Sequence, residues 1–139
     1  MIVLPDVNVL VGIVWPTHVH HYVARSWFDQ IADTGWATTP QTEQGFLRMC
    51  MNASVVSRPT SAGQAIAMIS ALRDVGRHEF WPDDVDAVSF LPAASHIQGY
   101  RQITDTHLLL LAQRHNGVVA TLDRGMAQLP GPSESILPA

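Results

Sequence analysis

The chain has 139 residues, of which 47% are hydrophobic and 14% are charged, whereas an average domain carries about 25% charged residues. All eight basic residues are arginines, so the chain contains no lysine. This absence excludes the phosphate-binding loop of P-loop proteins, Schiff-base enzymes, kinases and lysine-dependent receiver domains.

The net charge is −4, from twelve acids and eight arginines, which argues against a broadly basic nucleic-acid binder. It leaves room for a local rim of arginines around an acidic site. Cys50 is the only cysteine, which excludes an internal disulfide and a cysteine-based zinc cluster. No apolar run approaches the length of a membrane span, and Met1–Asp6 lacks the basic start of a signal peptide. We expect one soluble, cytoplasmic domain over residues 1–139 with no membrane partner.

The first half of the chain predicts two strands and three helices. Short apolar runs are typical of buried strands, and apolar residues repeated every three to four positions predict helices. Thr39 has the residue type of a helix N-cap, and Gly35 is suited to end the preceding helix. In chain order we expect a strand at Met1–Leu4, helices at Val7–Val14 and His18–Asp33, a strand at Trp36–Thr38, and a helix from Pro40 to about Asn52.

The second half repeats this alternation. Gly76 and Gly117 are suited to end helices, and Thr104 has the residue type of an N-cap. We expect a helix at Thr60–Val75, a strand at His78–Trp81, a short helix at Leu91–Gln98, a helix from Thr104 to about His115, a strand at Val118–Leu122 and an edge strand at Ser135–Leu137. Strands that alternate with helices imply right-handed crossovers and a parallel sheet covered on both faces. The predicted fold class is therefore α/β, with three layers (α/β/α) and a short sheet of four or five strands.

Four acidic residues are predicted to lie at one edge of this sheet. Asp6 follows the first strand directly, and Asp123 follows the strand at Val118–Leu122. Glu43 lies in the first turns of the helix after the second strand, and Asp105 lies at the start of a helix that runs antiparallel to the strands. Sites in open parallel sheets form beyond the carboxyl ends of the strands. We therefore expect these four carboxylates to converge.

Carboxylates that lie close together need a positive counter-charge to stay ionised. Mg²⁺ and Mn²⁺ supply it, because these ions prefer oxygen ligands. Enzymes that hydrolyse phosphodiesters commonly use one or two such ions. Each acid taken alone is also typical of a helix N-terminus. Asp105 after Thr104 is suited to simple capping, and Asp123 before Arg124 to a turn.

Four segments resemble the motifs of PIN-domain nucleases, in the same order. The matching segments are Leu4–Leu10, Thr39–Glu43, Thr104–Leu109 and Val119–Gly125. The stretch from Trp15-Pro16 through His18 and His21 resembles the VapC toxins of toxin–antitoxin pairs. The resemblance implies a PIN-like fold and a Mg²⁺- or Mn²⁺-dependent endoribonuclease. It also implies a homodimer, a cognate VapB-like antitoxin, and an RNA substrate of the transfer or ribosomal class.

The same resemblance assigns roles to individual residues. It implies that Asn8 and Thr121 each hold a carboxylate or a water beside the ligands. It implies catalytic and metal-binding roles for Asp6, Glu43, Asp105 and Asp123. Two alternatives stay open at this point: a catalytically inactive PIN-like binding module, and a metal-dependent nuclease that acts on DNA or performs another phosphotransfer.

Three arginines are candidates to bind phosphate groups, because the two-pronged guanidinium matches the geometry of phosphate oxygens. These are Arg124, Arg48 and Arg101. His18 and His21 share one helical face, but without a clear third ligand a helix-start or interface role is favoured over zinc. The acids Asp83, Asp84 and Asp86 are interpreted as a solvated loop or a helix N-cap rather than as a second metal site.

Overall fold

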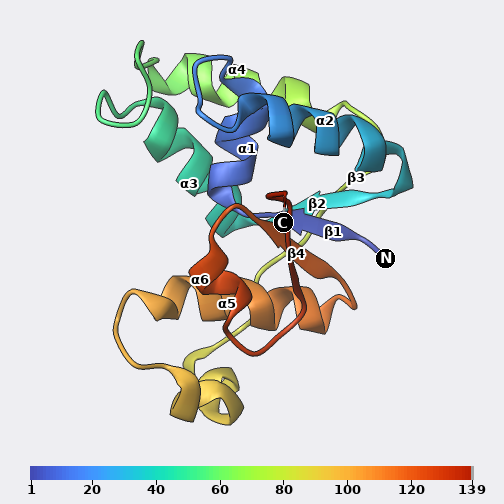
Figure 1. The fold of residues 1–139 in the computed structure, drawn as a ribbon, viewed down its shortest axis with the longest axis vertical. Coiled ribbons are helices and arrows are strands. Elements are labelled where there is room, and N and C mark those ends of the chain that lie inside the picture. Colours follow the sequence, from blue (N-terminus) through green and yellow to red (C-terminus); the bar gives the residue numbers. More distant parts are fainter. Residues whose placement is uncertain (139) are drawn as a thin grey trace.

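Five short strands form one parallel sheet in the order β3-β2-β1-β4-β5 (Figure 1). The computed structural model describes residues 1–138. The predicted parallel sheet is confirmed, and it has the larger of the two expected strand numbers. The strands are β1 (Val3–Pro5), β2 (Trp36–Thr38), β3 (His78–Phe80), β4 (Val118–Thr121) and β5 (Ser133–Ser135).

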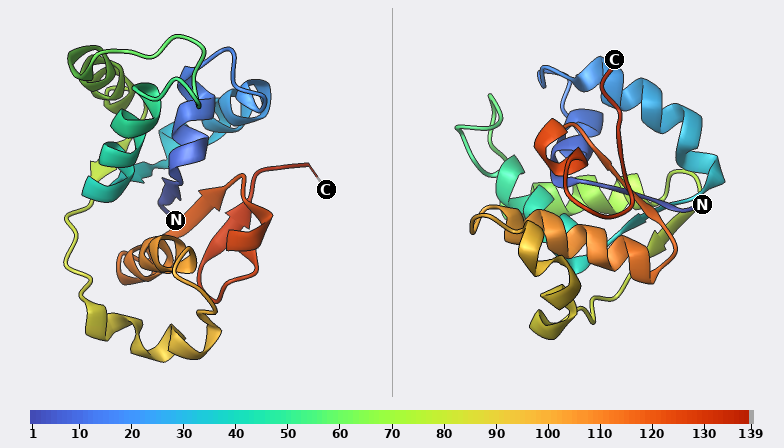
Figure 2. Two further views of the ribbon diagram at one scale, coloured as in Figure 1. Left: turned by 90° about the vertical axis from the view of Figure 1, so that its left-hand side faces the viewer. Right: turned by 60° about the horizontal axis from the view of Figure 1, so that its bottom comes forward.

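Helices cover both faces of the sheet, so the three-layer α/β/α architecture is also confirmed (Figure 1). One layer holds α1 (Val7–Val14), α2 (His21–Ile31), α3 (Pro40–Cys50) and α4 (Ala62–Arg73), and a 3₁₀ turn, η1 (Ala32–Thr34), follows α2. The other layer holds a 3₁₀ segment, η2 (Ala87–His96), then α5 (Gln102–Arg114) and the short α6 (Arg124–Ala127). An extended segment after β3 carries the chain from the first layer to the second (Figure 2). Of the helices within residues 1–138, none is long and apolar enough to cross a membrane.

Two hydrophobic clusters hold the layers to the sheet. Trp36 faces the α1–α4 layer, where it is fully buried and meets Phe28 edge-on at 5.0 Å between ring centroids. Leu4, Leu108 and Val119 belong to the cluster on the α5 side. Successive side chains of a strand point to opposite faces of the sheet. A three-residue strand can therefore contribute side chains to both hydrophobic clusters.

The helices α1 and α3 begin at residues whose side chains cap them, and the cap at Thr39 is one that the sequence predicts. Asp6 and Thr39 cap α1 and α3, and the Thr39 hydroxyl accepts a hydrogen bond from the backbone N–H of Thr42 at 3.1 Å. Gly35 and Gly76 have φ values of 122° and 63°, a conformation that favours glycine. The predicted strand at Trp36–Thr38 and the helix at Val7–Val14 are confirmed to the residue.

Several boundaries were predicted wrongly. The short helix expected at Leu91–Gln98 is the 3₁₀ segment η2, which begins at Ala87, and the errors at two further boundaries have a clear physical reason. Thr104 does not cap α5, because the helix already begins at Gln102 and Thr104 lies within its first turn. The Gln102 side chain accepts a hydrogen bond from the backbone N–H of Gln98 at 2.6 Å, which favours the earlier start. The last strand is Ser133–Ser135 rather than Ser135–Leu137, since the turn at Gly131 (φ 133°) brings the chain beside β4 sooner.

The acidic segment before η2 is tied to α5. Asp86 caps η2, as its predicted N-cap interpretation requires. Oδ2 of Asp83 lies 2.8 Å from Nε2 of His107, and Asp84 forms an ion pair with Arg114 at 2.9 Å. Two of the three acids therefore position the crossing segment rather than face only solvent.

A Gly117→Ala substitution is expected to lower the free energy of unfolding by about 1–3 kcal/mol, because overpacking strains a filled interior. The added Cβ would lie 2.5 Å from a ring atom of Trp81 and 2.7 Å from the carbonyl oxygen of Ile2. Gly63→Ala is the matched control. Nothing lies within 4 Å of a Cβ there, and alanine in a helix is favoured by up to about 1 kcal/mol. Urea unfolding of the two variants checks the prediction, and an equal effect at both positions would contradict it.

Candidate active site at the carboxyl edge of the sheet

Asp6 and Asp123 lie at the carboxyl ends of two neighbouring strands, β1 and β4. The Asp6 Oδ1 atom accepts a hydrogen bond from the backbone N–H of Val7 at 2.7 Å. Thr121 is fully buried between the two acids. Its Oγ1 donates to Oδ2 of Asp6 at 3.5 Å and accepts from the backbone N–H of Asp123 at 2.8 Å. The threonine hydroxyl therefore links the turns that carry both aspartates.

Asp105 joins this pair from the first turn of α5. Burial raises the pKa of Asp105 to about 6, and repulsion from Asp6 and Asp123 adds to the rise. Burial also raises the pKa of Asp6; hydrogen bonds from Val7 and Thr121 oppose this, and Asp123 reinforces it. Three of the four predicted acids thus lie close enough for each charge to disfavour its neighbours.

Glu43 is held by a different set of partners. Its Oε2 atom accepts a hydrogen bond from Oγ1 of Thr38 at 2.5 Å and lies 3.3 Å from Nη1 of Arg73. The Thr38 oxygen also lies 2.7 Å from Nε2 of His78. Because the single hydroxyl proton of Thr38 is donated to Glu43, the histidine must donate its Nε2–H to Thr38. The guanidinium of Arg73 stacks over the Phe80 ring at 5.4 Å.

Arg73 was missed by the sequence analysis. It lies 30 positions beyond Glu43, in the last turn of α4, where a basic residue is expected simply to complement the helix dipole. The pairing depends on how α4 packs beside α3. Only that tertiary contact identifies Arg73 as a neighbour of the site.

The ligand atoms available at this edge are of the kind that hard divalent cations prefer. The three aspartates offer only anionic oxygens, and their mutual repulsion is the kind that a cation relieves. Within residues 1–138, no three His, Cys, Asp or Glu side chains lie close enough to hold one ion as they stand. Mg²⁺ keeps several waters and takes only one or two carboxylates directly. The residues fit such a partly hydrated ion.

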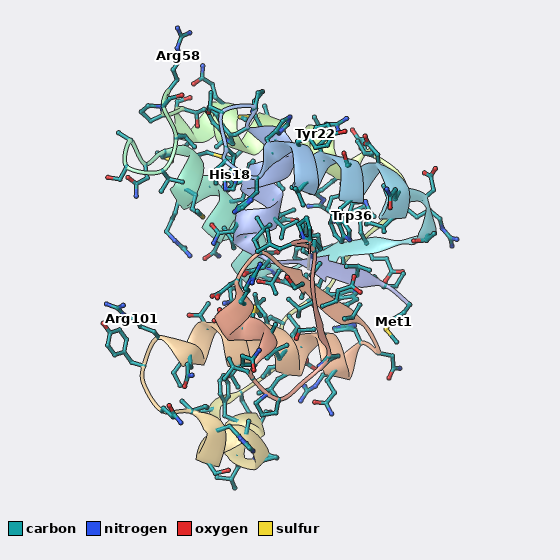
Figure 3. The ribbon with its side chains drawn as sticks, viewed as in Figure 1. Met1, His18, Tyr22, Trp36, Arg58 and Arg101 are labelled. Carbon is teal, nitrogen blue, oxygen red and sulfur yellow. The ribbon has the colours of Figure 1, made fainter. Side chains whose placement is uncertain are left out.

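The remaining predicted residues, Asn8 and the three arginines, are all exposed to solvent. Asn8 is exposed in the first turn of α1, and Arg124 is exposed directly after Asp123. Arg48 is exposed near the end of α3. Arg101 lies beside the Tyr100 ring, and Figure 3 shows its side chain directed out of the lower half of the molecule. Across residues 1–138, none of the three arginines forms an ion pair with an acid.

Three histidines lie on and beside the loop that joins α1 to α2. His21 is the first residue of α2, as the helix-start interpretation predicts, and its Nδ1 lies 2.7 Å from the carbonyl oxygen of Gly12. Figure 3 shows His18 beside α1. His18 and His20 also line a cavity that reaches Asp123. The structure therefore brings this loop to the edge of the candidate site.

The comparisons with known sequences agree with this architecture. A model of the PIN domain matches residues 3–132. The chain is 43% identical over 128 residues to ribonuclease VapC39 of Mycobacterium tuberculosis, covering 91% of this chain and 92% of that one. It is 40% identical over 139 residues to ribonuclease VapC29 of the same species, covering 99% and 98%.

Solved structures show the same fold at low identity. VapBC2 from Rickettsia felis, crystallised with a DNA fragment from its promoter, has a TM-score of 0.67 at 14% identity, covering 97% of this chain and 98% of that one. PAE2754 from Pyrobaculum aerophilum has a TM-score of 0.59 at 16% identity, covering 96% and 83%. The chain belongs to the PIN-domain family. Within that family its relatives are the VapC proteins.

Proposed function

We propose that this protein is a divalent-metal-dependent endoribonuclease, the toxin of a type II toxin–antitoxin pair. The observation that carries the proposal is the cluster of Asp6, Asp105 and Asp123 at the carboxyl edge of the sheet, where each charge raises the energy of the others. The relatives named as ribonucleases support the choice of RNA as the substrate. A bound Mg²⁺ or Mn²⁺ ion supplies an activated water and charge for the leaving oxygen.

The residues of the chain then have separate tasks. Asp6, Asp105 and Asp123 would hold the ion, directly or through its bound waters, and Glu43 would join them on release from Arg73. Thr121 orients Asp6 through its hydroxyl. Asn8 extends from the first turn of α1, where its amide is free to hold a water or a carboxylate. Arg124, exposed next to Asp123, contacts a phosphate of the substrate.

Arg73 competes with the ion for Glu43, and this gives a prediction. An Arg73→Met variant, which keeps an apolar side chain over Phe80, is expected to bind Mn²⁺ up to about fivefold more tightly, the factor that a half-exposed ion pair supplies. In a Glu43→Gln background the same change is expected to have no effect. Calorimetric titration of the four proteins measures the coupling. Equal changes in both backgrounds would contradict the competition.

The same proposal includes protein partners and an RNA target. The Rickettsia felis relative was solved as a VapBC complex, which supports a VapB-like antitoxin for this chain. Exposed apolar side chains offer surface for that antitoxin and for a second copy of the chain in a homodimer; among them are Val19, Tyr22, Val88, Leu91 and Tyr100. An RNA target of the transfer or ribosomal class implies action in the cytoplasm. The whole of residues 1–139 acts as one PIN-like domain in this scheme.

The substrate class is tested by offering three nucleic acids of one sequence: single-stranded RNA, the corresponding DNA, and the RNA in a duplex. With Mg²⁺ or Mn²⁺ present, we expect internal cleavage of the single-stranded RNA. Cleavage of the DNA instead would favour the DNA-acting alternative. No cleavage of any of the three, together with no divalent-ion binding by calorimetry, would favour an inactive binding module.

A further inference from the structure

A cavity of 280 Å³ opens beside the aspartate cluster. Three parts of the fold build it: the start of α1, the loop between α1 and α2, and the turn between β4 and α6. Its lining residues are Asn8, His18, Val19, His20, Leu122 and Asp123. Asp123 belongs to both the cavity and the carboxylate cluster, so a group held in the cavity lies next to the bond that the site would cut. The volume, at the small end for ligand pockets, suits one ring system.

The loop that carries the histidines is anchored to α1. A carbonyl oxygen only accepts hydrogen bonds, so His21 must donate its Nδ1–H to the carbonyl oxygen of Gly12, at 2.7 Å. His18 also packs close to this part of α1, since its Nδ1 would lie 3.5 Å from a Cβ placed on Gly12, which is ordinary van der Waals contact. The wall of the cavity is therefore built on a helix rather than on a free loop.

The imidazole of His18 is a neutral donor. The backbone N–H of His20 donates to Nδ1 of His18 at 3.0 Å, so this nitrogen carries no proton. Burial lowers the pKa of His18, and the neighbouring His20 and His21 lower it further. The proton of the neutral ring is then on Nε2, where it can be donated to a ligand.

The other lining groups favour a flat, uncharged ligand. Across residues 1–138 the His20 ring has no hydrogen-bond partner, and it lies 6.0 Å from the His18 ring. Val19, which is 86% exposed, and Leu122 supply apolar walls, and the Asn8 amide offers both a donor and an acceptor. No arginine lines the cavity, and the Asp123 carboxylate repels anions, so a phosphate is disfavoured there.

We propose that this cavity binds one unpaired nucleobase of the RNA, that of the nucleotide beside the scissile bond. Proteins recognise unpaired RNA bases by stacking them on aromatic rings, histidine included, and by hydrogen bonds to their edges. In this cavity the His20 ring stacks on the base, while Nε2–H of His18 donates a hydrogen bond to its edge. The assignment rests on the proposed ribonuclease function for the identity of the polymer.

Binding is tested without cleavage, on the full chain in chelator, by following the imidazole signals of His18 and His20 in NMR titrations. The probes are the four nucleosides and inorganic phosphate. We expect at least one nucleoside to shift these signals saturably and phosphate to leave them unchanged. His20→Ala is expected to weaken nucleoside binding about fivefold or more, and His20→Phe to retain it, because the phenyl ring still stacks.

His96→Ala is the matched control, since His96 is exposed at the end of η2, on the other layer of the fold (Figure 1). It is expected to bind nucleosides like the wild type. The assignment is overturned if no nucleoside shifts the histidine signals, if phosphate shifts them, or if His20→Ala and His96→Ala behave alike.

Cleavage of a random-sequence RNA pool separates this inference from the proposed function. The wild type and His96→Ala are expected to prefer one base at a position beside the cut, and His20→Ala to lose that preference. Cleavage with a preference that survives His20→Ala would overturn the cavity assignment and leave the ribonuclease function standing. Nucleoside binding without cleavage of any RNA would overturn the ribonuclease function and leave the base-binding cavity standing.

Discussion

Replacing Asp6 by asparagine is expected to slow RNA cleavage by more than about 100-fold without loss of the fold. Partners outside the direct ligands of a metal typically contribute 10- to 100-fold, so a direct ligand contributes more. Asparagine is as good a helix N-cap as aspartate, so the cap at Val7 survives the change. The variant removes the charge and little else. Rates on a single-stranded RNA, with circular dichroism as the test of folding, measure the effect.

Two further variants provide comparisons for the cleavage rate of Asp6→Asn. Thr121→Val keeps the shape of the buried side chain but removes the hydroxyl between Asp6 and Asp123, and we expect a loss of about 10- to 100-fold. Asp29→Asn removes an exposed carboxylate of α2 that pairs with Arg25, and we expect no loss. An Asp6→Asn protein that folds and cleaves at the rate of Asp29→Asn would contradict the assignment of Asp6.

Asp105→Asn is expected to raise the melting temperature by about 3–6 °C at pH 7.5 in the presence of a chelator. The pKa of Asp105 is about 6 in the folded protein, above its ordinary value of 3.8. At neutral pH the folded state therefore holds an unfavourable charge, worth about 1–2 kcal/mol after allowance for solvent screening of this partly exposed group. The neutral amide removes that penalty.

The gain in melting temperature of Asp105→Asn is expected to depend on pH in a defined direction. A carboxyl with a raised folded-state pKa destabilises the protein fully above that pKa, and the penalty disappears as the pH falls towards 3.8. The difference between variant and wild type should therefore shrink from pH 7.5 to pH 4. Melts across this range measure it, with Asp33→Asn, an exposed residue of η1, expected to show no such trend. A lower melting temperature for Asp105→Asn at pH 7.5 would indicate that Asp105 is an ordinary helix-start residue.

Local signals in the sequence were enough to predict most of the fold. Thr39-Pro40 determines where α3 begins because the cap and the missing N–H of proline act within four residues. The start of α5 was wrong for the opposite reason. Thr104 is a good cap by residue type, but the turn and the Gln102 side chain before it allow the helix to begin earlier.

The convergence of the aspartates at the candidate site could be predicted because topology alone places them. In a parallel sheet the residues after β1 and β4 share an edge, and the helix that returns to β4 begins there. The partners of Glu43 could not be predicted, since they depend on how α4 packs beside α3. Likewise, the spacing of His18 and His20 shows only that they are neighbours, and the cavity that they line requires the turn after β4.

The dependence of RNA cleavage on divalent-ion concentration, measured with metal-stripped protein, tests the central claim most directly. We expect no cleavage in chelator, a rate that rises to saturation as Mn²⁺ or Mg²⁺ is added, and no comparable rate from Asp6→Asn at any concentration of the ion. Undiminished cleavage by the wild type in chelator would contradict a metal site at Asp6, Asp105 and Asp123, as would a wild-type rate from Asp6→Asn at saturating metal.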